Sequence, residues 1–167
     1  MLSISKTASV SSLSDITPSE RGSNIYIGDH VFIDSLVRIK AVGGEGDIVI
    51  GDNCFINSGT VMFSGNGIVL GEWVLVAPNC TFVPVNHSFD SPEIPMRFQG
   101  FTDSRGGIIV EDNVWIGAGT TLLDGSILRS GCVVGAGSLV KGELRSNCVY
   151  AGNPIRLIKN RFSESTD

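Results

Sequence analysis

Large apolar residues recur every six positions along residues 110–140, with small and polar residues between them. The recurring positions are Val110, Ile116, Leu122, Leu128, Val134 and Val140. A period of six matches neither the 3.6-residue turn of an α-helix nor the simple alternation of a strand in a hairpin sheet. Each six-residue unit is therefore predicted to be a short strand with a corner.

The same spacing extends upstream, where the corresponding positions are Ile27, Ile33, Ile39, Ile50, Ile56, Met62, Leu70, Val76 and Phe82. Extra residues interrupt the period only after every third unit: five after the Ile39 unit, two after the Met62 unit and 22 after the Phe82 unit. Insertions confined to every third corner are expected for a triangular coil of three units. The sequence thus predicts five coils, which begin at Ile27, Ile50, Leu70, Val110 and Leu128.

The predicted fold class is all-β, a triangular parallel β-solenoid of about five coils, stacked at the ~4.8 Å spacing of neighbouring strands. Residues 27–145 form the repeat domain, and residues 88–107 leave it as a long protruding loop. Residues 1–26, in which we find no repeat, are expected to be a loose lead-in that covers the first coil. Residues 146–167 are expected to form a C-terminal extension that folds back over the last coil, because Asn153-Pro154 breaks the period.

Composition narrows the range of functions. The 167 residues carry a net charge of −5 without a strong basic patch, which argues against nucleic-acid binding. No apolar run approaches the ~18–20 residues that cross a bilayer, and no secretory signal is visible, so a cytoplasmic location and no transmembrane segment are expected. Cys54, Cys80 and Cys132 share the fifth place of their units and are expected to be small buried thiols rather than a disulfide or metal site.

Two histidines are candidates for chemistry. His30 lies in a corner of the first predicted coil, where a solvated side chain is the ordinary interpretation. His87 stands where the chain leaves the solenoid for the long loop, and long loops in tight folds are often functional. A lone histidine is structural by default, but one at the root of this insertion is well placed to act on a ligand.

A family resemblance sharpens this picture. The coils of IGDN type, the histidine at the root of a looped-out arm, and VGAGSLV followed by YAGNPIRLIKN resemble the hexapeptide-repeat acyltransferases, most closely the sugar and polysaccharide O-acetyltransferases. The resemblance covers about residues 27–160. It implies a left-handed β-helix, a handedness that ordinary parallel crossovers do not have. It also implies acetyl-CoA as co-substrate and a homotrimer as the active form.

For catalysis, the resemblance implies that His87 is the general base that takes the proton of the attacking hydroxyl, a role that neutral imidazole suits near pH 7. It implies that Asn57 is an amide donor to the oxyanion; the alternative is an ordinary asparagine at a left-handed corner. The predicted reaction is a direct transfer that needs no covalent intermediate. It needs no metal either: the hexapeptide-repeat metal enzymes would require three histidine ligands, and this chain has two histidines.

For the cofactor, the resemblance implies main-chain hydrogen bonds from Ala118 and Ala136 to the pantetheine arm; the alternative is that small residues merely fit the corner. The two alanines lie 18 residues apart, which is one coil. Trp115 resembles the aromatic residue that borders the acetyl and acceptor pocket, and Lys159 matches a basic position near the nucleotide. Residues 141–161 carry a net charge of +4, which would attract the phosphates of acetyl-CoA.

The expected function is therefore transfer of an acetyl group from acetyl-CoA to a hydroxyl of a sugar or polysaccharide precursor. Transfer to the amine of an amino sugar, and a purely structural or binding solenoid, are the alternatives. The units place Asn57, Trp115, Ala118 and Ala136 around the corner of the first and second faces, and His87 at the corner of the third and first faces. One face of the triangular solenoid, roughly 15–20 Å wide, would separate the two corners. His87 could not reach a thioester at the other corner of its own subunit, so each active site is expected to lie between two subunits.

Overall fold

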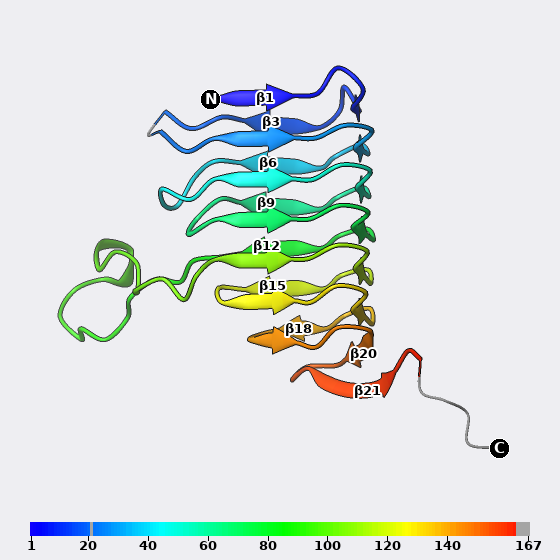
Figure 1. The fold of residues 1–167 in the computed structure, drawn as a ribbon. Coiled ribbons are helices and arrows are strands. Elements are labelled where there is room, and N and C mark those ends of the chain that lie inside the picture. Colours follow the sequence, from blue (N-terminus) through cyan, green and yellow to red (C-terminus); the bar gives the residue numbers. More distant parts are fainter. Residues whose placement is uncertain (21, 163–167) are drawn as a thin grey trace.

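In the computed structural model, which describes residues 1–20 and 22–162, the chain winds into a column of stacked coils. The rungs follow one another from the N-terminal to the C-terminal end, and one long loop projects sideways after β12 (Figure 1). Three parallel sheets form the faces of the column, and each coil contributes one strand to each sheet. The expected all-β solenoid with a protruding loop is therefore confirmed.

Each sheet stacks every third strand of the chain. Sheet A contains β1 (Leu2–Ile4), β4 (Ile25–Ile27), β7 (Ile48–Ile50), β10 (Ile68–Leu70), β13 (Ile108–Val110), β16 (Ser126–Leu128) and β19 (Glu143–Leu144). Sheet B contains β2 (Ser9–Val10), β5 (Phe32–Ile33), β8 (Phe55–Ile56), β11 (Leu75–Val76), β14 (Trp115–Ile116), β17 (Val133–Val134), β20 (Cys148–Ala151) and β21 (Arg156–Asn160). Sheet C contains β3 (Asp15–Thr17), β6 (Arg38–Lys40), β9 (Val61–Phe63), β12 (Thr81–Val83), β15 (Thr121–Leu123) and β18 (Leu139–Val140).

The periodic apolar positions form the core. All 15 of the positions that define the predicted period are buried, with Ile33, Met62, Phe82 and Leu122 at 0% exposure. Each corner lies in the middle of a six-residue unit, and each strand spans the junction between two units. We call the corners that join the sheets the A–B, B–C and C–A corners. Cys54, Cys80 and Cys132 are buried and free, as expected.

The A–B corners need a left-handed backbone. His30, Asn53 and Asn113 occupy equivalent A–B corner positions with φ of 55°, 59° and 56°. Asparagine tolerates this conformation because its short side chain bonds the nearby backbone. Trp73 adopts the same conformation with φ of 59° in the fourth coil, although bulky side chains rarely do so.

The prediction of a lead-in without a repeat was wrong. Strands β1, β2 and β3 form a complete coil, and they pair in register with β4, β5 and β6 of the next coil. Their apolar residues Ile4, Val10 and Ile16 follow the same period of six, in a stretch otherwise rich in serine. Ile4 remains 40% exposed because this coil is the end of the column. The solenoid therefore has six complete coils instead of five.

The boundary predicted after residue 145 was also wrong. Strands β19 and β20 add a partial seventh coil, in which Leu144 and Tyr150 are buried and lie six residues apart, although Leu144 follows Val140 by only four. The expected fold-back follows it: β21 runs antiparallel to β20 and ends sheet B. Residues 163–167 of the predicted extension lie outside the described residues.

The protruding loop, called the arm below (residues 88–107), leaves and re-enters the column through a narrow neck. His87 and Phe101 form an antiparallel bridge, and the N–H of Thr102 donates to the carbonyl of Asn86 at 2.9 Å. Farther out, the side chain of Gln99 donates to the carbonyl of Ile94 at 2.6 Å, beside a short 3₁₀ turn, η1 (Met96–Phe98). Hydrogen bonds across the neck and within the arm therefore give it a defined shape. None of the described helices has the length and apolar character needed to span a membrane.

Candidate active site

His87 lies at the C–A corner of the fourth coil, at the base of the arm. Its imidazole is exposed and packs on the ring of Phe101, with centroids 4.7 Å apart and ring planes at 50°. The bridge to Phe101 fixes the backbone on which the imidazole stands. The ring makes no hydrogen bond to another described residue, so its two nitrogens are available to a ligand or solvent.

A pocket of about 630 Å³ opens beside His87. It is lined by the two chain segments that form the neck. Asn86, Phe89 and Asp90 belong to the outgoing segment, and Thr102, Asp103, Ser104 and Arg105 belong to the returning segment. The mixture of carboxylates, hydroxyls and a guanidinium gives the pocket a polar character. An imidazole in such a wall can exchange a proton with a polar ligand bound there.

Asp124 fixes the returning end of the arm. This residue is 3% exposed, and its carboxylate accepts hydrogen bonds from the N–H groups of Arg105 at 2.8 Å and Gly107 at 2.9 Å. The side-chain amide of Asn66 donates to the same carboxylate at 3.2 Å. A buried carboxylate is stabilised by donors of this kind, and here they come from the arm and the third coil. The arm is thereby tied to the coils on either side of it.

Asn57 lies at the B–C corner of the third coil. Its side-chain Nδ2 donates to the carbonyl of Val76 in the next coil at 2.8 Å, and its backbone N–H approaches the same oxygen at 3.0 Å. One of the two amide hydrogens is therefore engaged in holding adjacent coils together. The structure thus gives Asn57 a structural role, and its role as an amide donor to the oxyanion stays a prediction.

Ala118 and Ala136 form an exposed row on the B–C corner, as their spacing predicts. The N–H of Gly119 donates to the carbonyl of Pro78 at 2.9 Å, and the N–H of Gly137 donates to the carbonyl of Ala118 at 2.8 Å. The N–H groups of the two alanines themselves have no acceptor among the described residues. Two accessible main-chain donors therefore stand one coil apart on the open surface of this corner.

Trp115 and Lys159 both belong to sheet B. Trp115 was expected at a corner but lies on β14, because strands span the junctions between units; its side chain points outward and is 50% exposed. Lys159 is exposed on β21, opposite Val149 of β20, at the C-terminal end of the sheet. A ligand running from the alanine row toward Lys159 would follow the last coils of the column.

The candidate residues form two groups on one chain. Asn57, Ala118 and Ala136 share the B–C corner, whereas His87 stands at the C–A corner, with sheet C between the two corners. Asn57 is two coils away from Ala118, or ~10 Å along the column. A single chain therefore does not bring His87 to the alanine row. No group of three or more His, Cys, Asp or Glu side chains suited to a metal ion occurs in the described part of the chain.

Two residues of this region escaped the sequence analysis. Phe101 contacts His87 across the neck, and Asp124 anchors the return of the arm. Asp124 could have been noticed in the sequence. Asp124 and Gly125 alone form the C–A corner of their coil, where the preceding coils have longer insertions. Phe101 gave none, because its position depends on how the arm folds back.

Comparison with known proteins places the chain in a family. Residues 107–142 match the family described as bacterial transferase hexapeptide (six repeats), and residues 47–81 match the hexapeptide repeat of succinyl-transferase. Over 149 residues the chain is 32% identical to a putative lipopolysaccharide biosynthesis O-acetyl transferase of Escherichia coli, covering 85% of this chain and 74% of that protein. The chain belongs to the hexapeptide-repeat acetyltransferase family. Its fold is accordingly the triangular left-handed β-helix.

Solved structures of two acyltransferases are similar to this fold. An N-acyltransferase of Bacillus cereus in complex with dTDP-4-amino-4,6-dideoxyglucose and coenzyme A has a TM-score of 0.79 and 27% identity, covering 97% of this chain and 85% of that one. A hexapeptide-repeat acetyltransferase of Vibrio cholerae, complexed with acetyl coenzyme A, has a TM-score of 0.71 and 27% identity, covering 83% and 72%.

The lengths of the relatives differ from that of this chain. A putative acetyltransferase of Saccharomyces cerevisiae is 34% identical over 113 residues, which are 68% of this chain but 56% of that protein. The chain therefore spans between about half and three quarters of the length of such relatives.

Proposed function

We propose that this protein transfers an acetyl group from acetyl-CoA to a hydroxyl of a sugar or polysaccharide precursor, with His87 as general base. The observation that carries the proposal is the exposed imidazole of His87, which has no hydrogen-bond partner among the described residues and lines a polar pocket at the base of the arm. The similarity to the protein described as a putative lipopolysaccharide biosynthesis O-acetyl transferase supports a sugar hydroxyl as the acceptor.

The reaction is a direct attack on the thioester. A ring nitrogen of neutral His87 accepts the proton of the acceptor hydroxyl as its oxygen bonds to the thioester carbonyl carbon. The tetrahedral intermediate then collapses, the carbon–sulfur bond breaks, and the departing thiolate takes the proton from the imidazolium. Asn57 is proposed to stabilise the oxyanion through the amide hydrogen that Val76 does not engage.

Acetyl-CoA is proposed to lie along the B–C corner toward the C-terminal end. The free N–H groups of Ala118 and Ala136 would donate to the amide carbonyls of its pantetheine arm, and Trp115 would border its acetyl end. The phosphates would meet the positive charge of residues 141–161, Lys159 among them.

A homotrimer would bring the two groups of residues together. Two faces carry outward apolar rows in register. The row on sheet A consists of Tyr26, Val49, Val69, Ile109 and Ile127. The row on sheet B consists of Phe32, Phe55, Leu75, Trp115 and Val133. A cyclic assembly needs two different surfaces that meet, and these rows flank one shared corner, the A–B corner.

Turning the A–B corners toward the three-fold axis gives the proposed site. Sheet A of one subunit then faces sheet B of the next across a cleft. The outer rims of this cleft are the C–A corner of the first subunit and the B–C corner of the second. His87 would thus stand opposite Ala118 and Ala136 of the neighbour. Trp73, which is 60% exposed at the A–B corner, would pack near the axis.

A second candidate, N-acylation of an amino sugar, is favoured by the likeness to the N-acyltransferase that binds dTDP-4-amino-4,6-dideoxyglucose. The test offers hydroxyl and amine acceptors side by side and follows release of the CoA thiol. The wild-type protein should acetylate hydroxyl acceptors, and His87→Ala should lose this activity. Turnover with amines alone would select the second candidate, and no acyl transfer to any sugar would contradict both.

A further inference from the structure

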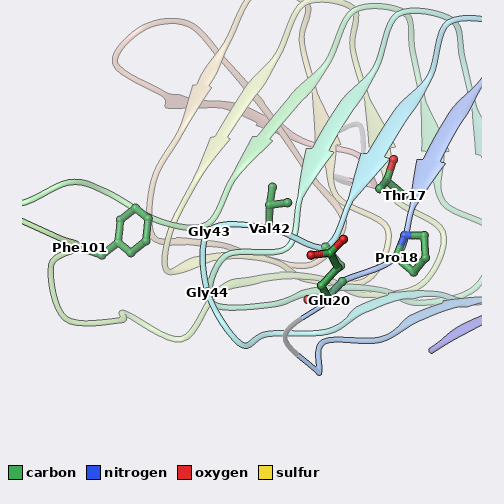
Figure 2. A pocket seen from close by; sticks show the side chains of 9 residues that line it. Thr17, Pro18, Glu20, Val42, Gly43, Gly44 and Phe101 are labelled. Carbon is green, nitrogen blue, oxygen red and sulfur yellow. The ribbon is translucent and has the colours of Figure 1, made fainter. Parts of the chain in front are cut away.

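A second pocket lies on the N-terminal side of Phe101, away from the alanine row. It has a volume of about 470 Å³ and is formed by the end of the first coil, the corner insertion of the second coil and the arm. Thr17, Pro18 and Glu20 form one side, Val42, Gly43 and Gly44 another, and Phe101 stands at the far end (Figure 2). Apart from Phe101, none of these positions belongs to the site described above.

The pocket is a direct neighbour of His87. Phe101 lines it, and the Phe101 ring also packs on the imidazole, with centroids 4.7 Å apart. A Cβ built on Gly43 would lie 3.6 Å from Cγ1 of Val85, which precedes His87 by two residues. Gly43 of the pocket lining therefore lies close to Val85, near the root of the arm. A ligand longer than the pocket would extend past Phe101 to the imidazole.

The chemistry of the lining suits an uncharged sugar ring. Val42, Pro18 and the Phe101 ring offer apolar surface for the carbon–hydrogen faces of a pyranose, which pack well on aromatic rings. Glu20 is the one charged side chain among the described lining residues, and its carboxylate can accept hydrogen bonds from sugar hydroxyls. The nearby Lys40 ammonium is engaged with the carboxylate of Asp15 at 3.0 Å. A phosphate in this pocket would meet the negative charge of Glu20.

We propose that this pocket is an acceptor subsite for a neutral sugar unit adjacent to the unit that is acylated at His87. The proposal rests on the proposed function, because it assigns His87 as the base. Acetyl-CoA would approach along the later coils of the neighbouring subunit, where its Ala118 and Ala136 lie, and the acceptor along the first two coils of the subunit that carries His87. The preferred acceptor is then a neutral glycoside or oligosaccharide rather than a nucleotide diphosphate sugar.

Two substitutions test the subsite without touching His87. Glu20→Gln keeps the shape of the side chain but removes the charge, and Val42→Trp fills the pocket from a half-exposed position. Glu45→Gln and Leu13→Trp are the matched controls, at exposed positions outside the lining. We expect Glu20→Gln to raise the KM for neutral disaccharides by about 10-fold or more, as loss of a charge-assisted hydrogen bond does. Val42→Trp should raise the same KM because its ring occupies the pocket. The KM for acetyl-CoA and both controls should stay near wild type.

Two outcomes would overturn the subsite while leaving the acetyltransferase intact. One is an unchanged acceptor KM in both test variants; the other is a higher kcat/KM for a nucleotide diphosphate hexose than for the matching neutral glycoside. If no sugar is acetylated at all, the proposed function fails instead. Binding at the subsite is then measured by saturation-transfer NMR with a neutral disaccharide and no acetyl-CoA. Disaccharide signals that are present with wild type and lost with Val42→Trp support the subsite, and equal signals with both proteins refute it.

Discussion

The shared active site can be tested by mixing two inactive variants. His87→Ala removes the proposed base, and Ala136→Trp places a large ring on the row proposed for pantetheine. Ala136 is exposed on the B–C corner, so a larger side chain there can extend into solvent without entering the core. Each variant should fold and trimerise, and each alone should be nearly inactive.

The geometry of one chain explains why the two defects should complement each other. One six-residue unit separates the C–A corner from the B–C corner, and at ~3.3 Å per residue this edge spans roughly 15–20 Å. A general base must come within hydrogen-bond reach, about 3 Å, of the proton that it takes. His87 therefore cannot serve a thioester on the alanine row of its own subunit across sheet C.

The expected recovery follows from counting junctions. After unfolding and reassembly of an equal mixture, a junction is intact when one subunit supplies His87 and its neighbour supplies Ala136. Random association makes this true of about one junction in four, so the mixture should regain about a quarter of wild-type activity in a thiol-release assay.

A complementary mixture provides the control. The double variant His87→Ala/Ala136→Trp, mixed equally with wild type, should retain about a quarter of the activity if sites are shared, but about half if each site lies within one subunit. Native mass spectrometry verifies that mixed trimers have formed. Mixed trimers without recovered activity, together with a half-active control mixture, would refute the shared site.

Three further predictions concern separate parts of the molecule. His87→Ala should lower kcat by ~10²–10⁴-fold while the Kd for acetyl-CoA, measured by calorimetry, stays the same; near-normal turnover would remove His87 from catalysis. Trp73→Asn should relieve the left-handed strain yet shift the trimer toward monomer in sedimentation equilibrium, and an unchanged trimer would place the axis away from the A–B corner. Burial raises the pKa of Cys54 to about 11 and of Cys132 to about 12, so both thiols should resist iodoacetamide at pH 7.5 until the protein is denatured; rapid labelling of the native protein would contradict this.

The period of six determined most of the fold. A repeated local unit places each large apolar residue in the same surroundings, so Ile33, Met62 and Phe82 could be assigned to the core without knowledge of distant contacts. The same arithmetic placed Ala118 and Ala136 in one row. It failed at the ends, where Ile4 and Tyr150 extend the column beyond the predicted limits. There the repeat is weaker in sequence, because a terminal coil packs against a neighbour on one side only.

The surroundings of His87 were decided by the tertiary structure alone. The arm has no period, so its shape depends on contacts between residues distant in sequence, such as His87 with Phe101 and Asp124 with Arg105. The second pocket likewise combines Glu20, Val42 and Phe101 from three separate segments. A repeat specifies structure locally because every unit packs in equivalent surroundings. An insertion instead takes its shape from the distant residues that bond its backbone and contact its side chains. The sequence alone thus located the column and the root of the arm, and only the folded chain determined what surrounds them.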